Sequence, residues 1–365
     1  MPANPEKVIQ SIRDAELQPP EMLTLMITDR CNLQCRHCWL DCGPDSPAGP
    51  MPANIVCDII DGFTRLGGTG LSLTGGEVLT HPDWFEILVF ACEHPGLKEV
   101  CLQTNAMLMT RQAAAELSKL SSTKLSIQIS LDGASEKSHD LIRGKESFNR
   151  ALRGLDCLLD AEMGPQIRVA FTEMAHNYDG IPRLMKRLET FGIRQFVSST
   201  LVKDGRAGRT NRLALPTPDQ YAEMVNLYRS DAAFRSLYDK MGSISAIEWY
   251  KGRSTSATQV CSCIKTPFIN AGGRMYPCVM LSAEKYSVGG VHQRPMADAV
   301  LAALPLWAQL PVMERKRREA LENCKGCPGK AHCQGGCMGR AYAVCGDLMS
   351  AEDRCALRRA VYQLG

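Results

Sequence analysis

The sequence lacks the features that mark several large classes of protein. Its 42 lysines and arginines nearly balance 39 aspartates and glutamates, a formal charge of +3, so it has no basic field for binding nucleic acid through released counterions. No apolar run approaches the roughly 18 residues of a membrane-spanning helix. The first twenty residues are polar and contain acids, unlike a signal peptide. Low-complexity segments and tandem repeats are absent. These absences predict a cytoplasmic protein that binds neither nucleic acid nor membrane.

Against this background, the 17 cysteines need an explanation. A chain of 365 residues is long enough for about two domains of roughly 100 to 200 residues each, and disulfides are rare in the reducing cytoplasm. Four cysteines lie between residues 31 and 42, and nine follow residue 260. Thiols grouped in this way indicate metal binding. The widely spaced cysteines are predicted to be small buried hydrophobic residues: Cys57, Cys92, Cys101 and Cys157.

The chain from residue 23 to about 200 repeats a strand pattern followed by a helix pattern. Strands are expected at 23–28, 70–74, 98–104, 125–131, 167–172 and 195–200, and helices at 54–66, 83–93, 111–120, 148–161 and 178–191. Parallel strands need helical crossovers, so this order predicts an α/β fold with a parallel sheet. We favour a partial (β/α)6 barrel of TIM type over a flat doubly wound sheet. Polar and glycine-rich signatures follow strand after strand, and the strand ends of a barrel build one shared site.

Four parts are expected along the chain. An N-terminal arm covers 1–22, the barrel covers 23–215, and a bridging segment with a helix over 218–238 covers 216–258. The remainder, 259–365, is rich in cysteine and glycine and has few strand signals. This composition predicts a small module that is organised by metal instead of by a core of its own.

The first cysteine group follows the first expected strand directly. Cys31, Cys35 and Cys38 form C-x3-C-x2-C, a spacing that lets one loop surround one metal centre. Zinc would need a fourth ligand, which Cys42 or His37 could supply. An iron–sulfur cluster held by three thiolates would leave one iron open for a non-protein ligand. The loop position favours the open cluster, because the carboxyl ends of barrel strands carry the chemistry.

The segments after the next strands decide between these alternatives. Residues 74–77 read TGGE, residues 103–105 read QTN, residues 130–133 read SLDG and residues 139–144 read HDLIRG. In this order, together with the first cysteine group, they resemble the radical S-adenosylmethionine (radical SAM) superfamily. The resemblance implies that the three thiolates hold a catalytic [4Fe-4S] cluster. It implies SAM-binding roles for His37, Gly75, Gly76, Glu77, Thr104, Asn105, Ser130, Asp132 and Arg143.

Several of these roles have a physical reason. The glycines of the GGE motif let the backbone approach the methionine part of SAM closely, and the family uses this motif to hold the SAM amino group. By resemblance Ser130 contacts the ribose, and Arg143 meets the SAM carboxylate, which suits a planar guanidinium. Two positions depart from the usual pattern. His37 stands where the family more often has an aromatic tyrosine or phenylalanine, and Ala106 replaces the glycine of the TNG element.

The C-terminal cysteines resemble the SPASM domain, an auxiliary module of many radical SAM enzymes. The resemblance implies two auxiliary [4Fe-4S] clusters and therefore three clusters in all. The first set would be Cys261, Cys263, Cys278 and Cys337, and the second set Cys324, Cys327, Cys333 and Cys355. Three questions stay open: whether Cys261 is a ligand, whether Cys345 replaces Cys355, and whether the module is instead a pair of zinc knuckles.

The implied reaction begins when the open iron binds SAM. One electron from a donor such as flavodoxin or ferredoxin then cleaves SAM to methionine and a 5′-deoxyadenosyl radical, which abstracts hydrogen from the substrate. Sulfatase-maturing relatives carry an Asp after the cysteine equivalent to Cys278, where this chain has Val279, so sulfatase maturation is not expected. Candidate acid or base groups near the substrate are Glu248, Trp249, Tyr250 and Tyr276.

Three functions of different classes remain. We favour a maturase that modifies a peptide or protein, such as a ribosomal peptide. Only about twenty residues precede the first expected strand, so a separate leader-peptide-binding protein or the SPASM surface would recognise that peptide. The second function is oxidation or modification of a small molecule such as a tetrapyrrole or a sugar alcohol. The third is a non-catalytic iron–sulfur electron carrier.

Overall fold

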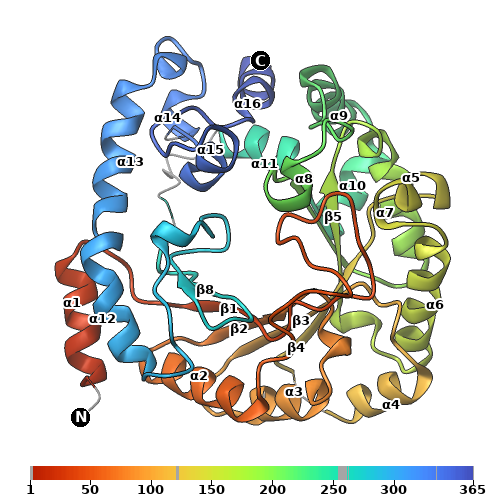
Figure 1. The fold of residues 1–365 in the computed structure, drawn as a ribbon. Coiled ribbons are helices and arrows are strands. Elements are labelled where there is room, and N and C mark those ends of the chain that lie inside the picture. Colours follow the sequence, from red (N-terminus) through yellow and green to blue (C-terminus); the bar gives the residue numbers. More distant parts are fainter. Residues whose placement is uncertain (1–2, 121–122, 254–260, 262, 334, 365) are drawn as a thin grey trace.

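The computed structural model describes residues 3–120, 123–253, 261, 263–333 and 335–364. Its central feature is one curved sheet that wraps around the middle of the molecule (Figure 1). The strand order is β7-β6-β5-β4-β3-β2-β1-β8-β9. The strands are β1 (Met22–Met26), β2 (Gly70–Thr74), β3 (Glu99–Thr104), β4 (Leu125–Ser130), β5 (Ile167–Glu173), β6 (Gln195–Thr200), β7 (Gly242–Ser243), β8 (Phe268–Ile269) and β9 (Met275–Tyr276).

The six predicted strands are all present, and each pairs in parallel with the next along the chain. Among the described residues the two end strands, β7 and β9, are not neighbours, so the barrel is partial. Strand β5 shows how the two faces differ. Ile167 and Val169 are buried and do not line the interior cavity, whereas Ala170 and Thr172 are partly exposed and line it, as the two-residue period of a strand requires.

Helices cover the outer face of the sheet (Figure 1). The crossover helices are α2 (Ala53–Arg65), α3 (Trp84–Glu93), α4 (Arg111–Lys119), α6 (Ser147–Asp160) and α7 (Ile181–Thr190). The other helices before the C-terminal module are α1 (Pro5–Asp14), α5 (Glu136–Arg143), α8 (Gly205–Gly208), α9 (Pro218–Ser230), α10 (Ala232–Met241) and α11 (Ser245–Gly252). Single 3-10 turns occur at η1 (Val78–Thr80), η2 (Gly164–Gln166), η3 (Tyr178–Gly180), η4 (Glu284–Tyr286) and η5 (Glu322–Cys324).

Two expected helices differ from the structure. The helix expected over 218–238 is two helices, because Asp231 ends α9 and caps α10 by accepting hydrogen bonds from the backbone N–H groups of Ala233 (2.9 Å) and Phe234 (3.0 Å). The helix expected from residue 178 begins at Ile181, after the 3-10 turn η3.

The C-terminal module is more helical than its composition predicts. Its helices are α12 (Met296–Trp307), α13 (Gln309–Ala320), α14 (Lys330–Cys333), α15 (Met338–Cys345) and α16 (Cys355–Gln363). Helix α12 packs on α1 and α2, and α16 packs on α9 and α11. Val300 and Trp307 are buried in the main hydrophobic core, so metal alone does not organise this region. The expected boundary between 258 and 259 lies outside the described residues.

A strand pairing and a buried arginine also attach this module to the barrel. Strand β8 pairs in parallel with β1, with Thr24 opposite Phe268, so the module supplies a strand to the barrel sheet. On α15, the buried Arg340 donates hydrogen bonds to the carbonyl oxygens of Thr200 (3.3 Å) and Leu201 (2.5 Å), just at the end of β6. The same guanidinium pairs with Asp353 at 2.9 Å.

One helical stretch, Met296–Ala320, is long and apolar enough to cross a membrane by length and composition alone. The sequence expectation that no such stretch exists is therefore wrong. Of its most apolar window, 44% is buried inside the molecule, and its first half lies against α1 (Figure 1). Apolar residues on such a helix are explained by packing in the core.

Candidate functional site

A cavity of about 470 Å³ lies at the carboxyl ends of the barrel strands. Its walls combine the loop after β1, the ends of β2 to β6 and a short segment of the C-terminal module. Most of the site residues predicted from sequence line it: Cys31, Cys35, His37, Cys38, Gly75, Gly76, Thr104, Asn105, Ser130 and Arg143. The structure therefore brings together motifs that the sequence separates by more than a hundred residues.

The loop that carries the three thiols is held by a residue that sequence reasoning missed. Arg206 on α8 donates to the carbonyl oxygens of Cys35 (2.8 Å) and Cys42 (2.7 Å), and its own N–H donates to the Cys38 carbonyl oxygen at 2.9 Å. Five charge-assisted donors in a fixed fork make arginine well suited to binding several carbonyls at once. No local signal could have identified this arginine, because it follows β6 in sequence and belongs to none of the recognised motifs.

The thiols of this loop influence one another. Burial, together with a smaller effect of the nearby Cys35 and Cys38, raises the pKa of Cys31 to about 12. Burial also raises the pKa of Cys35. A hydrogen bond from Cys42 lowers the pKa of Cys38 to about 6. The thiols therefore surround one small space, in which bound metal would replace their protons.

The donor set fits an iron–sulfur cluster better than zinc. Among the described residues, no group of three or more His, Cys, Asp or Glu side chains converges as a single ion would require. Cysteines that hold a [4Fe-4S] cluster bind different iron atoms, so their sulfur atoms need not converge on one point. The zinc alternative with Cys42 or His37 as fourth ligand is not supported by this geometry.

Glu77 lies behind the cavity wall. Its side chain is fully buried and accepts hydrogen bonds from Thr104 Oγ1 (2.7 Å), the Asn105 N–H (2.7 Å) and the Leu79 N–H (3.1 Å). Burial raises the pKa of this carboxyl group, and these three donors oppose that rise. Glu77 thus fixes the loop after β3 against the loop after β2, so that Thr104 and Asn105 face the cavity.

Asp132 has a similar position behind Arg143. Its buried carboxylate accepts from Arg143 Nε at 2.6 Å and from the Thr172 N–H at 2.6 Å, and His37 Nε2 lies 3.2 Å away. Burial alone would raise the pKa of Asp132, but Arg143 and His37 outweigh it and hold the pKa well below its usual range. The carboxylate stays charged and orients Arg143 and His37 at the cavity.

The eight C-terminal cysteines with predicted ligand roles are described, and they lie in two groups. In the first, the Sγ atoms of Cys261 and Cys263 are 3.0 Å apart. Burial, together with a smaller effect of Cys261 and Cys337, raises the pKa of Cys278 to about 12. The second group comprises Cys324, Cys327, Cys333 and Cys355. Burial raises the pKa values of Cys324, Cys333 and Cys355, and neighbouring thiols of the same group add to that rise. Cys345 is exposed at the end of α15.

The substrate side of the cavity is almost uncharged. Among the described residues that line it there is no Asp, Glu or Lys, and the one arginine, Arg143, is already paired with Asp132. The module contributes Val279 and Met280, which directly follow Cys278. Strands β4 to β6 contribute hydroxyl, amide and small apolar groups: Gln128, Ala170, Thr172, Val197, Ser199 and Thr200.

The acid and base candidates from sequence do not line this cavity. Glu248 is exposed and accepts a hydrogen bond from Tyr238 on α10. Trp249 packs beside Tyr221, with Arg358 over its ring, and Tyr250 stacks under Arg253 on the same outer helix. Tyr276 packs on Phe268. Tyr276 also lies in an apolar cluster with Cys31 and Cys42 of the thiol-bearing loop.

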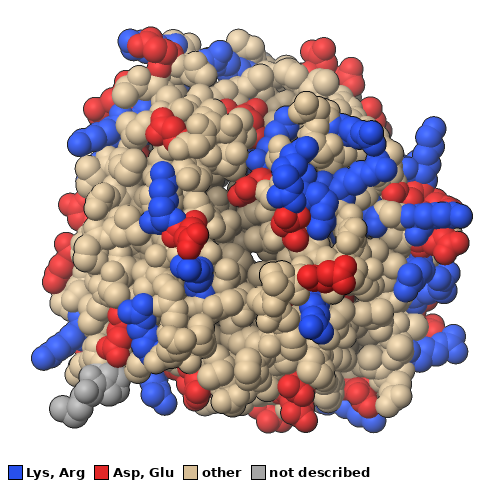
Figure 2. Space-filling view, viewed as in Figure 1, with Lys and Arg blue, Asp and Glu red and all other residues tan. Residues whose placement is uncertain are grey.

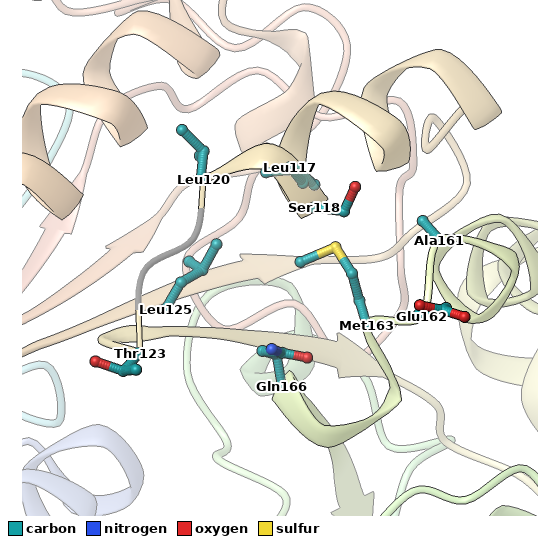
Figure 3. Close-up of a pocket in the computed structure, with 9 residues that line it drawn as sticks. All are labelled: Leu117, Ser118, Leu120, Thr123, Leu125, Ala161, Glu162, Met163 and Gln166. Atoms are coloured by element: carbon teal, nitrogen blue, oxygen red, sulfur yellow. The ribbon is translucent and has the colours of Figure 1, made fainter.

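A second cavity, of about 420 Å³, lies at the opposite, amino-terminal end of the sheet. Figure 3 shows its walls, formed by α4, the start of β4 and the turn before β5. Leu117, Leu120, Leu125 and Met163 supply much of the lining. None of the predicted site residues lines this cavity.

Comparisons with known proteins agree with this geometry. Residues 25–184 match the family model described as "Radical SAM superfamily". The "AdoMet-dependent heme synthase" of Methanosarcina barkeri is 26% identical over 360 residues, which cover 93% of this chain and 97% of the relative. "Mycofactocin maturase MftC" of Mycobacterium ulcerans is 26% identical over 335 residues, which cover 89% of this chain and 85% of the relative.

A solved structure supports the fold over nearly the whole chain. "Native anSMEcpe with bound AdoMet and Cp18Cys peptide" superimposes with a TM-score of 0.72 at 18% identity, covering 94% of this chain and 96% of that one. At this identity the likeness concerns the fold. It confirms the predicted combination of a partial barrel with a C-terminal cysteine-rich domain of SPASM type.

Proposed function

We propose that this chain, whose residues 25–184 match the radical SAM superfamily, is an enzyme that uses SAM and a [4Fe-4S] cluster to modify a peptide or protein. The cluster would be held by Cys31, Cys35 and Cys38, whose thiols line the cavity. When bound, the cluster and SAM supply the radical that removes hydrogen from the substrate. A non-catalytic electron carrier is not supported, because the chain has the family's catalytic domain.

The residues around the cavity have distinct tasks in this proposal. Arg206 holds the thiol-bearing loop, and Glu77 holds the Thr104–Asn105 turn. Asp132 keeps Arg143 directed at the cavity, where its guanidinium would bind the SAM carboxylate. Gly75 and Gly76 lie so close to the loop after β1 that a Cβ on either would stand 2.7 Å or 2.3 Å from a backbone oxygen. Glycine at both positions therefore lets the loop after β2 pack directly against the loop after β1.

The observation that carries the choice of substrate is the uncharged wall opposite the thiols. Burying a carboxylate without a cationic partner is costly, and the described lining offers no cation other than the paired Arg143. A neutral side chain of a peptide suits this wall, whereas the several carboxylates of a tetrapyrrole do not. The relative named a maturase and the solved structure with a bound peptide support the same substrate class.

Further parts of the proposal concern the module and the surroundings of the enzyme. The two groups of cysteines in the module would hold two auxiliary [4Fe-4S] clusters, giving three per chain. A separate reductant would supply electrons, and a separate leader-peptide-binding protein would assist recognition. The enzyme would work in the cytoplasm, where its 17 cysteines stay reduced.

The test is a mass comparison of candidate precursor peptides before and after anaerobic incubation with enzyme, SAM and reductant. We expect a defined mass change in one peptide, with 5′-deoxyadenosine formed in proportion. Cys35→Ala should abolish both and lower the iron content by about four per chain. Cys57→Ala, which removes a half-buried thiol on α2 far from the cavity, is the matched control. SAM cleavage with no change in any peptide, combined with turnover of a tetrapyrrole, would contradict the proposal.

A second candidate function is favoured by one observation. The similarity to the heme synthase spans 97% of that relative, so chemistry on a tetrapyrrole is the competing function. The same assay with a carboxylated porphyrin precursor decides between the two. Turnover of that precursor would require the carboxylates to lie outside the uncharged cavity, because Arg143 alone cannot pair with them.

A further inference from the structure

A dense group of cations lies beside the thiol-bearing loop. We define the basic patch as Arg36, Lys203, Arg206, Arg209 and Arg212. The two segments that contain it, 36–42 and 203–212, hold these five cations and only two carboxylates. This small area therefore has a formal charge of +3, as large as that of the whole 365-residue chain. Figure 2 shows lysine and arginine side chains gathered beside the central hollow, over the region where Figure 1 draws α8.

The structure joins these two segments into one surface. The N–H of Arg206 donates to the Cys38 carbonyl oxygen, and its guanidinium binds the Cys35 and Cys42 carbonyl oxygens. Arg209 pairs with Asp41 at 2.5 Å. Beneath them lies a small apolar cluster that joins α5, α8 and the ends of β5 and β6: Ile142, Met174, Leu201, Ala207 and Leu213.

Three cations of the patch make no ion pair that the structure records. Arg36, Lys203 and Arg212 have none among the described residues, and Arg36 and Arg212 are exposed. None of the five patch residues lines the cavity. The patch is thus on the outside of the thiol-bearing loop, separated from Cys35 and Cys38 by a single layer of backbone.

We propose that the basic patch is the docking surface for a small acidic electron-transfer protein that reduces the cluster on the loop behind it. This inference rests on the proposed function, because it needs a reducible cluster at Cys31, Cys35 and Cys38. In the step it serves, the donor loses one electron and the cluster gains that electron, with no atom transferred. A cationic surface steers an acidic partner and fixes its orientation.

The surface suits a folded protein better than a small anion or the substrate. Leu141 on α5 is 46% exposed, and the next residue, Ile142, accepts a hydrogen bond from the N–H of Arg36 at 2.8 Å. An apolar side chain at the border of a charged area is typical of protein interfaces. The substrate must enter the uncharged cavity on the other side of the loop, whereas an electron donor needs only the shortest route to the cluster.

The test uses the fully loaded enzyme and an acidic flavodoxin as the probe. The first measurement is the Kd for oxidised flavodoxin. The second is the rate of SAM cleavage without substrate, followed as 5′-deoxyadenosine and measured once with reduced flavodoxin and once with dithionite. In Lys203→Glu/Arg212→Glu we expect the Kd to rise at least about tenfold and the flavodoxin-driven rate to fall in step. The dithionite-driven rate should stay within about twofold of the wild type. Raising the salt concentration should weaken wild-type binding more than variant binding.

The matched control is Lys7→Glu/Arg13→Glu, which makes the same change of charge on the exposed side of α1. It should bind flavodoxin as the wild type does. Equal flavodoxin affinity in the patch variant and the wild type would overturn the proposal. So would a dithionite-driven rate that falls as much in the variant as its flavodoxin-driven rate does. Weaker binding of the substrate peptide with unchanged flavodoxin affinity would also overturn it. If the wild type binds flavodoxin through the patch but cleaves no SAM with either reductant, the proposed function fails and the docking surface stands.

Discussion

At the scale of single residues, Glu352 is the most constrained carboxylate of the C-terminal module. It is buried and accepts hydrogen bonds from Arg354 (2.7 Å), Arg358 (2.9 Å) and the N–H of Cys337 (3.0 Å). Burial alone would raise the pKa of Glu352, but the two guanidinium groups outweigh it and lower the pKa to about 2. The carboxylate therefore connects a predicted cluster ligand to two arginines near the other cysteine group.

This arrangement predicts a dependence of stability on pH. Because the folded pKa is lower than the ordinary value of 4.5, the charged carboxylate stabilises the fold above that value, and this contribution is lost as the pH falls from about 4.5 towards 2. The loss is on the order of 3 kcal/mol. Denaturant unfolding at a series of pH values should show it in the wild type, and Glu352→Gln should flatten the slope. Glu319→Gln, at an exposed position on α13, should keep it, and an unchanged slope in Glu352→Gln would refute the prediction.

The sequence predicted well which residues gather at the site. It predicted less well which of them direct their side chains into the cavity. The order of motifs identified Glu77 and Asp132, but both lie behind the wall and act on Thr104, Asn105 and Arg143. Residue type reveals a carboxylate, whereas the side that it faces depends on how two loops pack. No sequence pattern marks Arg206 as a site residue, because its partners are backbone carbonyl groups more than 160 residues away along the chain.

At the scale of elements, helix α6 sets the position of the turn after β3. Gly154 on α6 lies so close to this turn that a Cβ would stand 1.9 Å from the carbonyl oxygen of Ala106. Ala106 itself is buried with φ at 61°, a left-handed conformation that costs a non-glycine residue roughly 1–2 kcal/mol. The alanine that replaces the family's glycine is thus held in a strained turn by the helix behind it.

Gly154→Ala should therefore destabilise the protein, although alanine is ordinarily the better helix former. We expect a loss of about 1–3 kcal/mol, the usual result of forcing extra atoms into a packed region, together with weaker SAM binding because the Thr104–Asn105 turn moves. The control is Gly164→Ala, where a Cβ would meet only Leu159 Cδ2 at 3.6 Å. Unfolding free energies and SAM titrations measure both effects. A more stable Gly154→Ala with normal SAM affinity would contradict this account.

Local patterns predicted the regular elements and failed for those that depend on distant partners. The six parallel strands are found within about two residues of their expected positions, because alternating β-branched residues and glycine breaks are local signals. Strand β8 is only two residues long and exists because it pairs with β1, about 240 residues earlier. Helices α12 and α13 were missed because the cysteines and glycines around them dominated the composition of the segment.

At the scale of the whole molecule, Arg340 is the buried connection between module and barrel. Arg340→Ala would leave Asp353 buried without its partner, which costs about 3–5 kcal/mol, and would remove the hydrogen bonds to the end of β6. We expect faster hydrogen exchange in α15 and at the end of β6, and more SAM cleaved per substrate molecule modified.

Arg315→Ala is the control for this change, because its pair with Glu16 is on the exposed surface and contributes little. Hydrogen exchange followed by mass spectrometry compares the two variants with the wild type. Unchanged exchange at β6 in Arg340→Ala would show that the module is held by its other contacts.

The pairing of β8 with β1 has a consequence for the folding of the chain during its synthesis on the ribosome. Strand β1 emerges first, yet its second neighbour, Phe268–Ile269, is made after the whole barrel. Until then the nascent chain presents an open strand edge next to unprotected thiols, a combination prone to wrong pairing. Synthesis of the C-terminal module therefore sets the earliest moment at which β1 can be paired on both of its edges.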